Sequence, residues 1–151
     1  MILYLDTSAL VKLIVREDGT TDAIVWFEQA DLIASSVVTY AEACSALGQN
    51  DRQRGRTQSQ LAEWLMALDE HWREVMRVPV AEWPAGRLAL KHRLRGMDAV
   101  QLAAAVTLRE RLRTGTTGTS GAAVAFATFD RQLLAAAARE GFATFGGPLA
   151  T

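Results

Sequence analysis

The chain opens with residues 1–10, MILYLDTSAL, an unbroken apolar run that reaches the carboxylate of Asp6 and continues into a helix-like pattern. A strand without polar alternation is typical of a parallel sheet that helices cover on both faces. In such sheets ligands bind beyond the carboxyl ends of the strands, which is where Asp6 stands. This stretch therefore predicts an α/β fold and one edge of the sheet at which a site would lie.

The same order, an apolar strand and then an acid, recurs along the chain. Residues 122–129 form a strand-like run that ends at Asp130, and Glu42 follows the short strand expected at 32–35, near the start of a helix. Asp98 opens another helix-like segment, which is rich in alanine. Four carboxylates thus sit in apolar surroundings at the ends of elements: Asp6, Glu42, Asp98 and Asp130.

Strands and helices alternate along the whole chain. Strands are expected at 2–6, 32–35, 74–78, 122–129 and 142–145, and helices at 8–16, 20–29, 38–53, 57–72, 80–94, 98–113 and 131–139. The alternation predicts a three-layer α/β/α sandwich with a mostly parallel central sheet, and 151 residues favour a single domain. The helices at 38–53 and 57–72 are expected to form a hairpin that projects from the sheet. Residues 114–121 are expected to form a surface loop.

The composition says more about the cellular compartment of the protein than about its activity. The formal net charge of −1 indicates no particular class of partner. Cys44 is the single cysteine, so no disulfide can form within the chain and a reducing cytoplasm is favoured. Asp6 and Lys12 interrupt any secretory signal at the N-terminus, and no apolar run is long enough to span a membrane.

The four acids point to a metal-dependent reaction. Buried carboxylates in one place repel one another and take up protons unless a cation is bound. Oxygen ligands favour Mg²⁺ or Mn²⁺, since neither His71 nor His92 lies in a metal-ligand pattern. Such a site suits phosphodiester hydrolysis, because one metal can activate a water and a second, if bound, can stabilise the leaving oxygen. Taken singly, each acid also has a simpler explanation as a helix cap or a surface residue.

Two hydroxyl residues accompany the acids. Ser8 follows Asp6 by two residues, and Thr128 precedes Asp130 by two, so that on a strand their side chains point the same way. They are expected to orient a carboxylate or to bind a metal-bound water. Helix capping explains Ser8 equally well, and strand propensity explains Thr128 equally well.

Four segments together resemble a PIN-domain ribonuclease, specifically a VapC-type toxin of a bacterial toxin–antitoxin pair. They are residues 4–13 (YLDTSALVKL), 39–42 (TYAE), 95–103 (RGMDAVQLA) and 126–133 (FATFDRQL). The resemblance spans almost the whole chain, with the segments in the family's order and at family-like spacing. It implies a PIN-like fold and a Mg²⁺- or Mn²⁺-dependent endoribonuclease that cuts a structured cellular RNA, such as a tRNA, an rRNA or an mRNA. It also implies that Asp6, Glu42, Asp98 and Asp130 are the catalytic, metal-binding acids.

The resemblance further implies a homodimer and a cognate antitoxin that docks in the groove beside the acids. Arg95, just before Asp98, is expected to lie nearest the acidic site among the candidate arginines, and to contact a substrate phosphate or an acidic group of the antitoxin. The alternative function is a non-catalytic PIN-like scaffold that binds RNA or a protein, which would have a degenerate acidic set. A phosphatase with an aspartyl nucleophile is disfavoured, because the second aspartate of that pattern is replaced here by Ser8.

Overall fold

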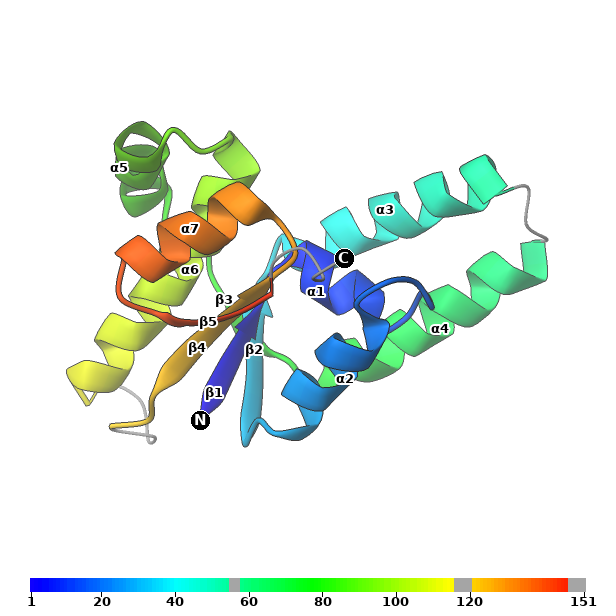
Figure 1. Ribbon diagram of the computed structural model, residues 1–151, viewed down its shortest axis with the longest axis horizontal. Coiled ribbons are helices and arrows are strands. Elements are labelled where there is room, and N and C mark those ends of the chain that lie inside the picture. Colours follow the sequence, from blue (N-terminus) through cyan, green and yellow to red (C-terminus); the bar gives the residue numbers. More distant parts are fainter. Residues whose placement is uncertain (55–57, 116–120, 147–151) are drawn as a thin grey trace.

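The computed structural model describes residues 1–54, 58–115 and 121–146, without the side chains of residues 51–54 and 58. Figure 1 shows a central sheet with helices on both sides. The strands are β1 (Ile2–Leu5), β2 (Leu32–Ser36), β3 (Met76–Val78), β4 (Val124–Thr128) and β5 (Ala143–Gly146). The helices are α1 (Thr7–Lys12), α2 (Thr20–Glu28), α3 (Thr39–Arg54), α4 (Gln58–Glu74), α5 (Glu82–His92), α6 (Gly96–Arg113) and α7 (Arg131–Arg139).

The sheet has the strand order β3-β2-β1-β4-β5, and every neighbouring pair is parallel. β1 lies in the centre, where Tyr4 is in register with Ala34 of β2 and with Phe126 of β4. The predicted three-layer α/β/α fold is therefore confirmed.

Alternation along β1 divides the core into two halves. Ile2 and Tyr4 pack in the core under α5, α6 and α7, whereas Leu3 and Leu5 pack in the core under α1 to α4. Both faces of β1 are covered by mainly apolar side chains, which explains why the opening run shows no polar alternation. Figure 1 shows the two helical layers on opposite sides of the sheet.

Helices α3 and α4 run side by side and extend away from the sheet, as expected for the hairpin (Figure 1). Trp64 and Leu68 of α4 are buried in the same core as Leu3 and Leu5. The Tyr40 hydroxyl of α3 donates to Asp69 Oδ1 of α4 at 2.7 Å. The apolar face of α4 therefore packs in the hydrophobic core of its own chain.

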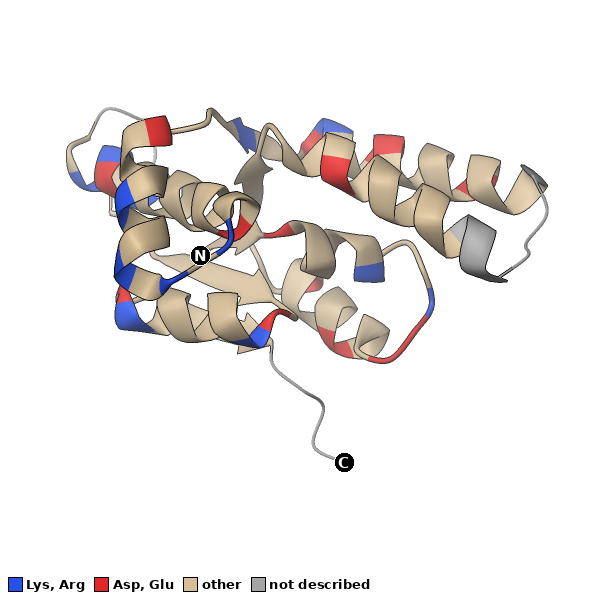
Figure 2. Ribbon diagram, turned by 90° about the horizontal axis from the view of Figure 1, so that it is seen from above, with Lys and Arg blue, Asp and Glu red and all other residues tan. Residues whose placement is uncertain are grey.

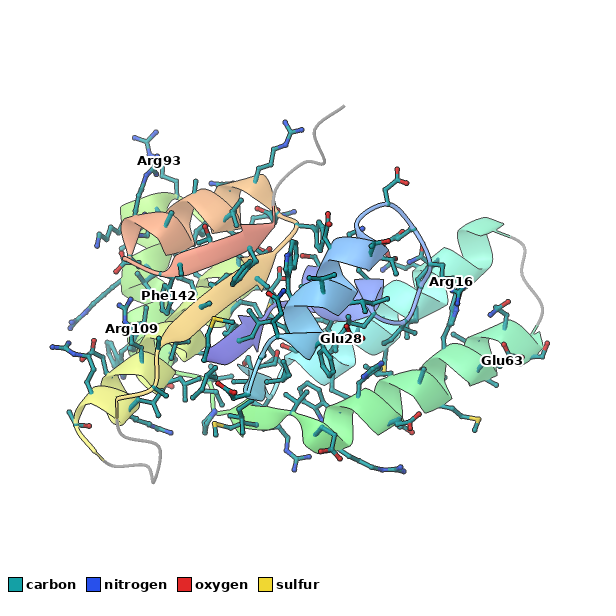
Figure 3. All side chains as sticks on the ribbon, turned by 60° about the horizontal axis from the view of Figure 1, so that its bottom comes forward. Arg16, Glu28, Glu63, Arg93, Arg109 and Phe142 are labelled. Carbon is teal, nitrogen blue, oxygen red and sulfur yellow. The ribbon has the colours of Figure 1, made fainter. Side chains whose placement is uncertain are left out.

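Polar contacts tie the opposite layer together at Glu140, the residue after α7. Its carboxylate contacts Lys91 Nζ and His92 Nε2 of α5, each at 2.6 Å. Arg109 of α6 donates to the Glu140 carbonyl at 2.8 Å and lies over the Phe142 ring at 4.1 Å (Figure 3). On the outer face of α5, Trp83 and Leu90 are 78% and 85% exposed.

Several element ends differ from the sequence-based prediction. The first helix ends at Lys12 rather than near residue 16, and α6 begins at Gly96, two residues before Asp98. Of the loop expected at 114–121, residues 116–120 lie outside the described residues. Within the described ranges, no helix combines the length and the apolar character that crossing a membrane requires.

The strand order places a topological switch point in the middle of the sheet. From β1 the chain passes outward to β2 and β3, and it returns on the other side of β1 as β4. At such a point the connections leave the two adjacent strands in opposite directions and open a crevice at their carboxyl ends. Asp6 follows β1 and Asp130 follows Thr128 at the end of β4, so both acids flank this crevice.

Candidate active site

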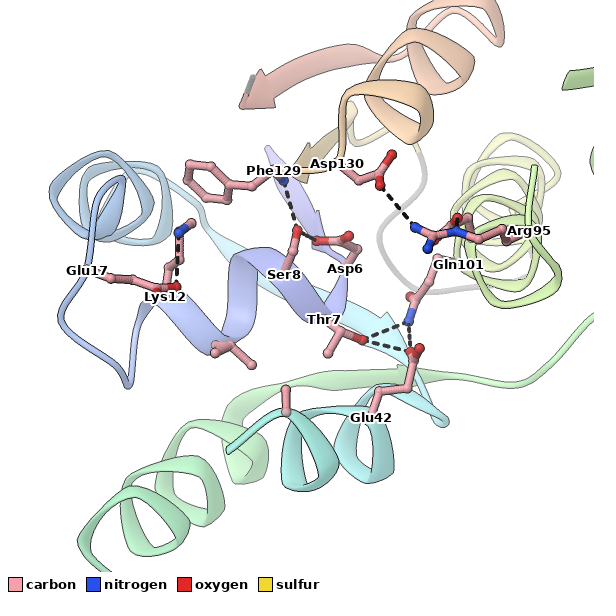
Figure 4. A pocket seen from close by; sticks show the side chains of 13 residues that line it. Asp6, Thr7, Ser8, Lys12, Glu17, Glu42, Arg95, Gln101, Phe129 and Asp130 are labelled. Carbon is pink, nitrogen blue, oxygen red and sulfur yellow. Dashed lines mark hydrogen bonds and ion pairs between the residues drawn. The ribbon is translucent and has the colours of Figure 1, made fainter. Parts of the chain in front are cut away.

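A pocket of about 420 Å³ opens at the carboxyl ends of β1 and β4 (Figure 4). All four acids that the sequence singles out line it: Asp6, Glu42, Asp98 and Asp130. They come from four separate elements, so their meeting depends on the fold and not on proximity in the sequence.

Asp6 is the most buried of the four, with 5% of its surface exposed. It is the N-cap of α1, and its Oδ1 accepts a hydrogen bond from Ala9 N–H at 3.0 Å. Burial raises the pKa of Asp6 from 3.8 to about 6, although hydrogen bonds from Ala9, Ser8 and Thr128 oppose the shift and Asp130 adds to it. Asp6 therefore both caps α1 and lines the pocket.

The two expected hydroxyls hold Asp6 from both sides. Ser8 Oγ donates to Asp6 Oδ1, and Thr128 Oγ1 donates to Asp6 Oδ2, each at 2.7 Å. Ser8 Oγ also accepts from Phe129 N–H at 2.8 Å, and Thr128 Oγ1 accepts from Asp130 N–H at 3.0 Å. The hydroxyls therefore link the ends of β1 and β4 and hold the Asp6 carboxylate in one orientation.

Glu42 lies in the first turn of α3 and is held through one oxygen. Its Oε2 accepts from Thr7 Oγ1 and from Gln101 Nε2, each at 2.7 Å (Figure 4). Gln101 is a pocket residue that was not predicted as part of the site. A signal was present, because this is a polar residue in the apolar run of α6, one helical turn after Asp98.

Asp98 and Asp130 both form ion pairs with the guanidinium group of Arg95. Arg95 Nε donates to Asp98 Oδ2 at 3.0 Å, and Arg95 Nη2 donates to Asp130 Oδ2 at 3.3 Å (Figure 4). Arg95 is the N-cap of α6, so Asp98 stands in the first turn of the helix and does not open it. Asp130 is the N-cap of α7 and accepts from Leu133 N–H at 2.8 Å.

The chemistry of the pocket fits a hard divalent cation. Its lining offers the oxygens of five carboxylates, the four acids and Glu17, which is paired with Lys12, but no histidine or cysteine. As the side chains are placed, however, no three acidic, histidine or cysteine groups in the described ranges converge closely enough to hold an ion. Arg95 instead stands between two of the acids, so a metal bound by Asp98 and Asp130 would replace its guanidinium.

Phe129 also lines the pocket, and this aromatic contribution was not anticipated from the sequence. The Phe129 ring stacks on Trp26 at 5.3 Å between centroids, and Lys12 Nζ lies 4.7 Å from the Phe129 centroid. Lys12 also donates to Glu17 Oε1 at 3.0 Å. Gly19 packs against the Phe129 ring with φ of 90°, so a side chain there would press this ring toward the pocket.

Comparisons with known proteins agree with this geometry. The profile of the PIN domain family matches residues 3–140. Ribonuclease VapC45 of Mycobacterium tuberculosis is 36% identical over 110 residues, which cover 71% of this chain and 76% of the relative. Ribonuclease VapC47 of the same species is 31% identical over 151 residues, with 94% of each chain covered. The crystal structure of PAE2754 from Pyrobaculum aerophilum superposes with a TM-score of 0.63 at 19% identity, covering 95% of this chain and 89% of that one, and so shows a common fold.

Proposed function

Since this chain belongs to the PIN-domain family and, within it, to the VapC-type ribonucleases, we propose that it is a metal-dependent endoribonuclease and the toxin of a toxin–antitoxin pair. Its substrate would be a structured cellular RNA in the cytoplasm. The observation that carries the proposal is the meeting of Asp6, Glu42, Asp98 and Asp130 in one pocket at the switch point of the sheet. The scaffold alternative would predict a degenerate acidic set, and this chain keeps all four acids.

Residues of this chain would divide the work of hydrolysis among them. Asp6, Asp98, Asp130 and Glu42 would hold Mg²⁺ or Mn²⁺, which when bound lowers the pKa of water and offsets the charge of the scissile phosphate. Ser8 and Thr128 keep Asp6 in one orientation through both of its oxygens. Asp6 is buried, so its negative charge is costly when no positive charge lies beside it. A cation bound at Asp6 would offset this cost.

Basic side chains suggest how RNA would approach. Figure 2 shows lysine and arginine gathered at the left-hand end of the molecule, over the layer of α5, α6 and α7. Apart from Arg109, which packs on Phe142, the lysines and arginines of this layer and its connections beyond Arg95 are Arg87, Lys91, Arg93, Arg111, Arg113, Arg131 and Arg139. Arg93 extends outward from this layer (Figure 3). We infer that the RNA backbone crosses this layer and enters the pocket beside Arg95, since phosphate contacts set the register of a nucleic acid.

Two protein partners are part of the proposal. A hollow beside the pocket, of about 710 Å³, is lined by Glu42, Arg95, Gly96, Met97, Asp98 and Val100, and Met97 is partly exposed there. An antitoxin docked in this hollow would cover the acids. The exposed Trp83 and Leu90 on α5 support the proposed homodimer, in which residues 1–151 of each copy form a single PIN-like domain.

The proposed function is tested by expressing the chain in a bacterial host and mapping new RNA 5′ ends across the transcriptome. We expect growth arrest together with discrete new ends in one or a few structured RNAs, because a toxin of this kind cuts a narrow target. Asp22→Asn, which alters an acid in the first turn of α2 outside the pocket, serves as the active control. Growth arrest without discrete ends, or with the same ends in an empty-vector culture, would argue against endonucleolytic cleavage.

Arg95→Ala is expected to lower kcat/KM for RNA by roughly 10- to 100-fold, the effect of losing a hydrogen bond from a charged group to a phosphate. The side chain is 78% exposed and already lies beside the acids, so it can turn toward a ligand. The same variant should bind Mn²⁺ more tightly, because the guanidinium no longer competes for Asp98 and Asp130. Kinetics and calorimetry measure both effects, and Arg73→Ala in the last turn of α4, away from the pocket and from the basic layer, is the matched control. Unchanged RNA cleavage and unchanged antitoxin affinity would remove Arg95 from the proposed site.

A further inference from the structure

Gln101 is a buried polar residue in a helix that is otherwise apolar at this depth. It is 3% exposed, and Leu102, Ala103, Ala104 and Ala105, which follow it, are buried core residues. An amide at such a position lowers stability unless it is fully hydrogen-bonded. The hydrogen-bond partners of the Gln101 amide therefore explain why this position holds a polar side chain.

The side chain joins the core of the sheet to the pocket. Its Oε1 accepts from the Tyr4 hydroxyl at 2.8 Å, and its Nε2 donates to Glu42 Oε2 at 2.7 Å and to Thr39 Oγ1 at 2.9 Å. These partners fix the orientation of the amide. A carboxylate accepts hydrogen bonds only, and burial raises the pKa of Tyr4 well above its ordinary value, so the phenol keeps the proton that it donates.

The consequence falls on Glu42. Two donors, Thr7 and Gln101, converge on Oε2, while no hydrogen bond from a described residue reaches Oε1 (Figure 4). One oxygen of the carboxylate is therefore anchored, and the other stays available. Two donors on one oxygen also remove the rotational freedom that a side chain of this length would otherwise keep.

We propose that Gln101 is a positioning residue of the nuclease: it anchors Glu42 by one oxygen so that the other serves the reaction. The inference rests on the proposed function and adds to it a residue outside the acidic set. Gln101 touches no reacting group itself, and it acts through Glu42. Partners that orient a metal-binding carboxylate typically contribute about 10- to 100-fold to metal affinity or activity.

Three variants separate positioning from simple packing. Gln101→Met keeps the length and apolar bulk of the side chain but removes the hydrogen bond from Gln101 to Glu42, while that from Thr7 remains. Gln101→Glu keeps an acceptor for Tyr4 and replaces the donor to Glu42 by a like charge. Tyr4→Phe removes the core contact and leaves Nε2 bonded to Glu42 and to Thr39. Thermal unfolding of each variant reports the loss of stability independently of activity.

We expect Gln101→Met and Gln101→Glu to lower kcat by about 10- to 100-fold with KM within about twofold, and to weaken Mn²⁺ binding in calorimetry by a similar factor. Tyr4→Phe should keep most of the activity and Mn²⁺ affinity even where its loss of stability equals that of the Gln101 variants. Folded Gln101 variants with wild-type kcat and Mn²⁺ affinity would overturn the proposal, as would a fall in all three variants that follows stability alone. A wild-type protein that neither cuts RNA nor binds Mn²⁺ would overturn the proposed function first.

Discussion

Replacing Asp6 by asparagine is expected to abolish RNA cleavage and, at the same time, to raise the stability of the metal-free protein. Asparagine keeps the size of the side chain and is an equally good N-cap for α1. It lacks the charge through which Asp6 would bind a cation, so cleavage should fall by at least about 100-fold, the size of a lost catalytic electrostatic contact. Cleavage assays and thermal unfolding of the same preparations measure the two effects.

The gain in stability follows from the raised pKa of Asp6. Between its ordinary pKa of 3.8 and the value of about 6 in the folded protein, the folded state holds a proton that the unfolded chain has released. Stability therefore falls as the pH rises through this window, and the loss persists above it. At about 1.4 kcal/mol for each pKa unit, removing the charge should stabilise the metal-free protein by up to about 3 kcal/mol at neutral pH.

The pH dependence distinguishes this explanation from a general effect of substitution. The stability difference between Asp6→Asn and the wild type should shrink as the pH falls from about 6 and approach zero only well below 3.8, where the wild-type carboxyl is protonated in both states. Asp22→Asn in the first turn of α2 is the control and should show no such difference. An Asp6→Asn variant that cuts RNA at the wild-type rate would refute the proposed role of this carboxylate.

Replacing both Asp98 and Asp130 by asparagine is expected to remove divalent-cation binding while leaving the fold intact. Asparagine can still accept the N-cap hydrogen bond that Asp130 receives from Leu133 N–H, and Asp98 is not a cap. Two negative charges disappear from the pocket, so Mn²⁺ affinity should fall by at least about 100-fold, or about 2.7 kcal/mol. RNA cleavage should fall in parallel.

Calorimetric titration with Mn²⁺ is the measurement for this double variant, with thermal unfolding as the test of its fold. Added Mn²⁺ should raise the midpoint of unfolding of the wild type, because a ligand that binds only the folded state stabilises it, but not that of the double variant. Equal Mn²⁺ affinity in the two proteins would place the cation elsewhere in the chain.

The sequence predicted the fold best where a short segment alone shows how it is buried, as the opening apolar run does. The apolar opening run predicted a buried central strand, and β1 is the middle strand of the sheet with both faces covered. The alternation of strands and helices predicted the α/β/α layers, and the strand-then-acid pattern predicted that the acids would gather at one edge. The resemblance to VapC-type PIN ribonucleases was confirmed by the comparisons.

What escaped prediction depends on tertiary contacts between distant segments. Gln101 bonds to Tyr4 and Glu42, which lie 97 and 59 residues away, so its polarity within an apolar helix marks the position but does not identify its partners. The stacking of Trp26 on Phe129 likewise forms only when α2 packs beside the end of β4. The start of α6 at Gly96 was misjudged because Asp98 looks like a cap in sequence, whereas Arg95 takes that position.

The most direct test of the central claim is RNA cleavage by the purified chain, freed of bound partner, with Mg²⁺ or Mn²⁺ and with EDTA. Total cellular RNA is the first substrate, and Asp6→Asn is assayed beside the wild type. We predict discrete cleavage products that require the metal, vanish with EDTA and are absent from the variant. Cleavage that persists in EDTA, or that is equal in wild type and Asp6→Asn, would contradict a nuclease centred on these four carboxylates.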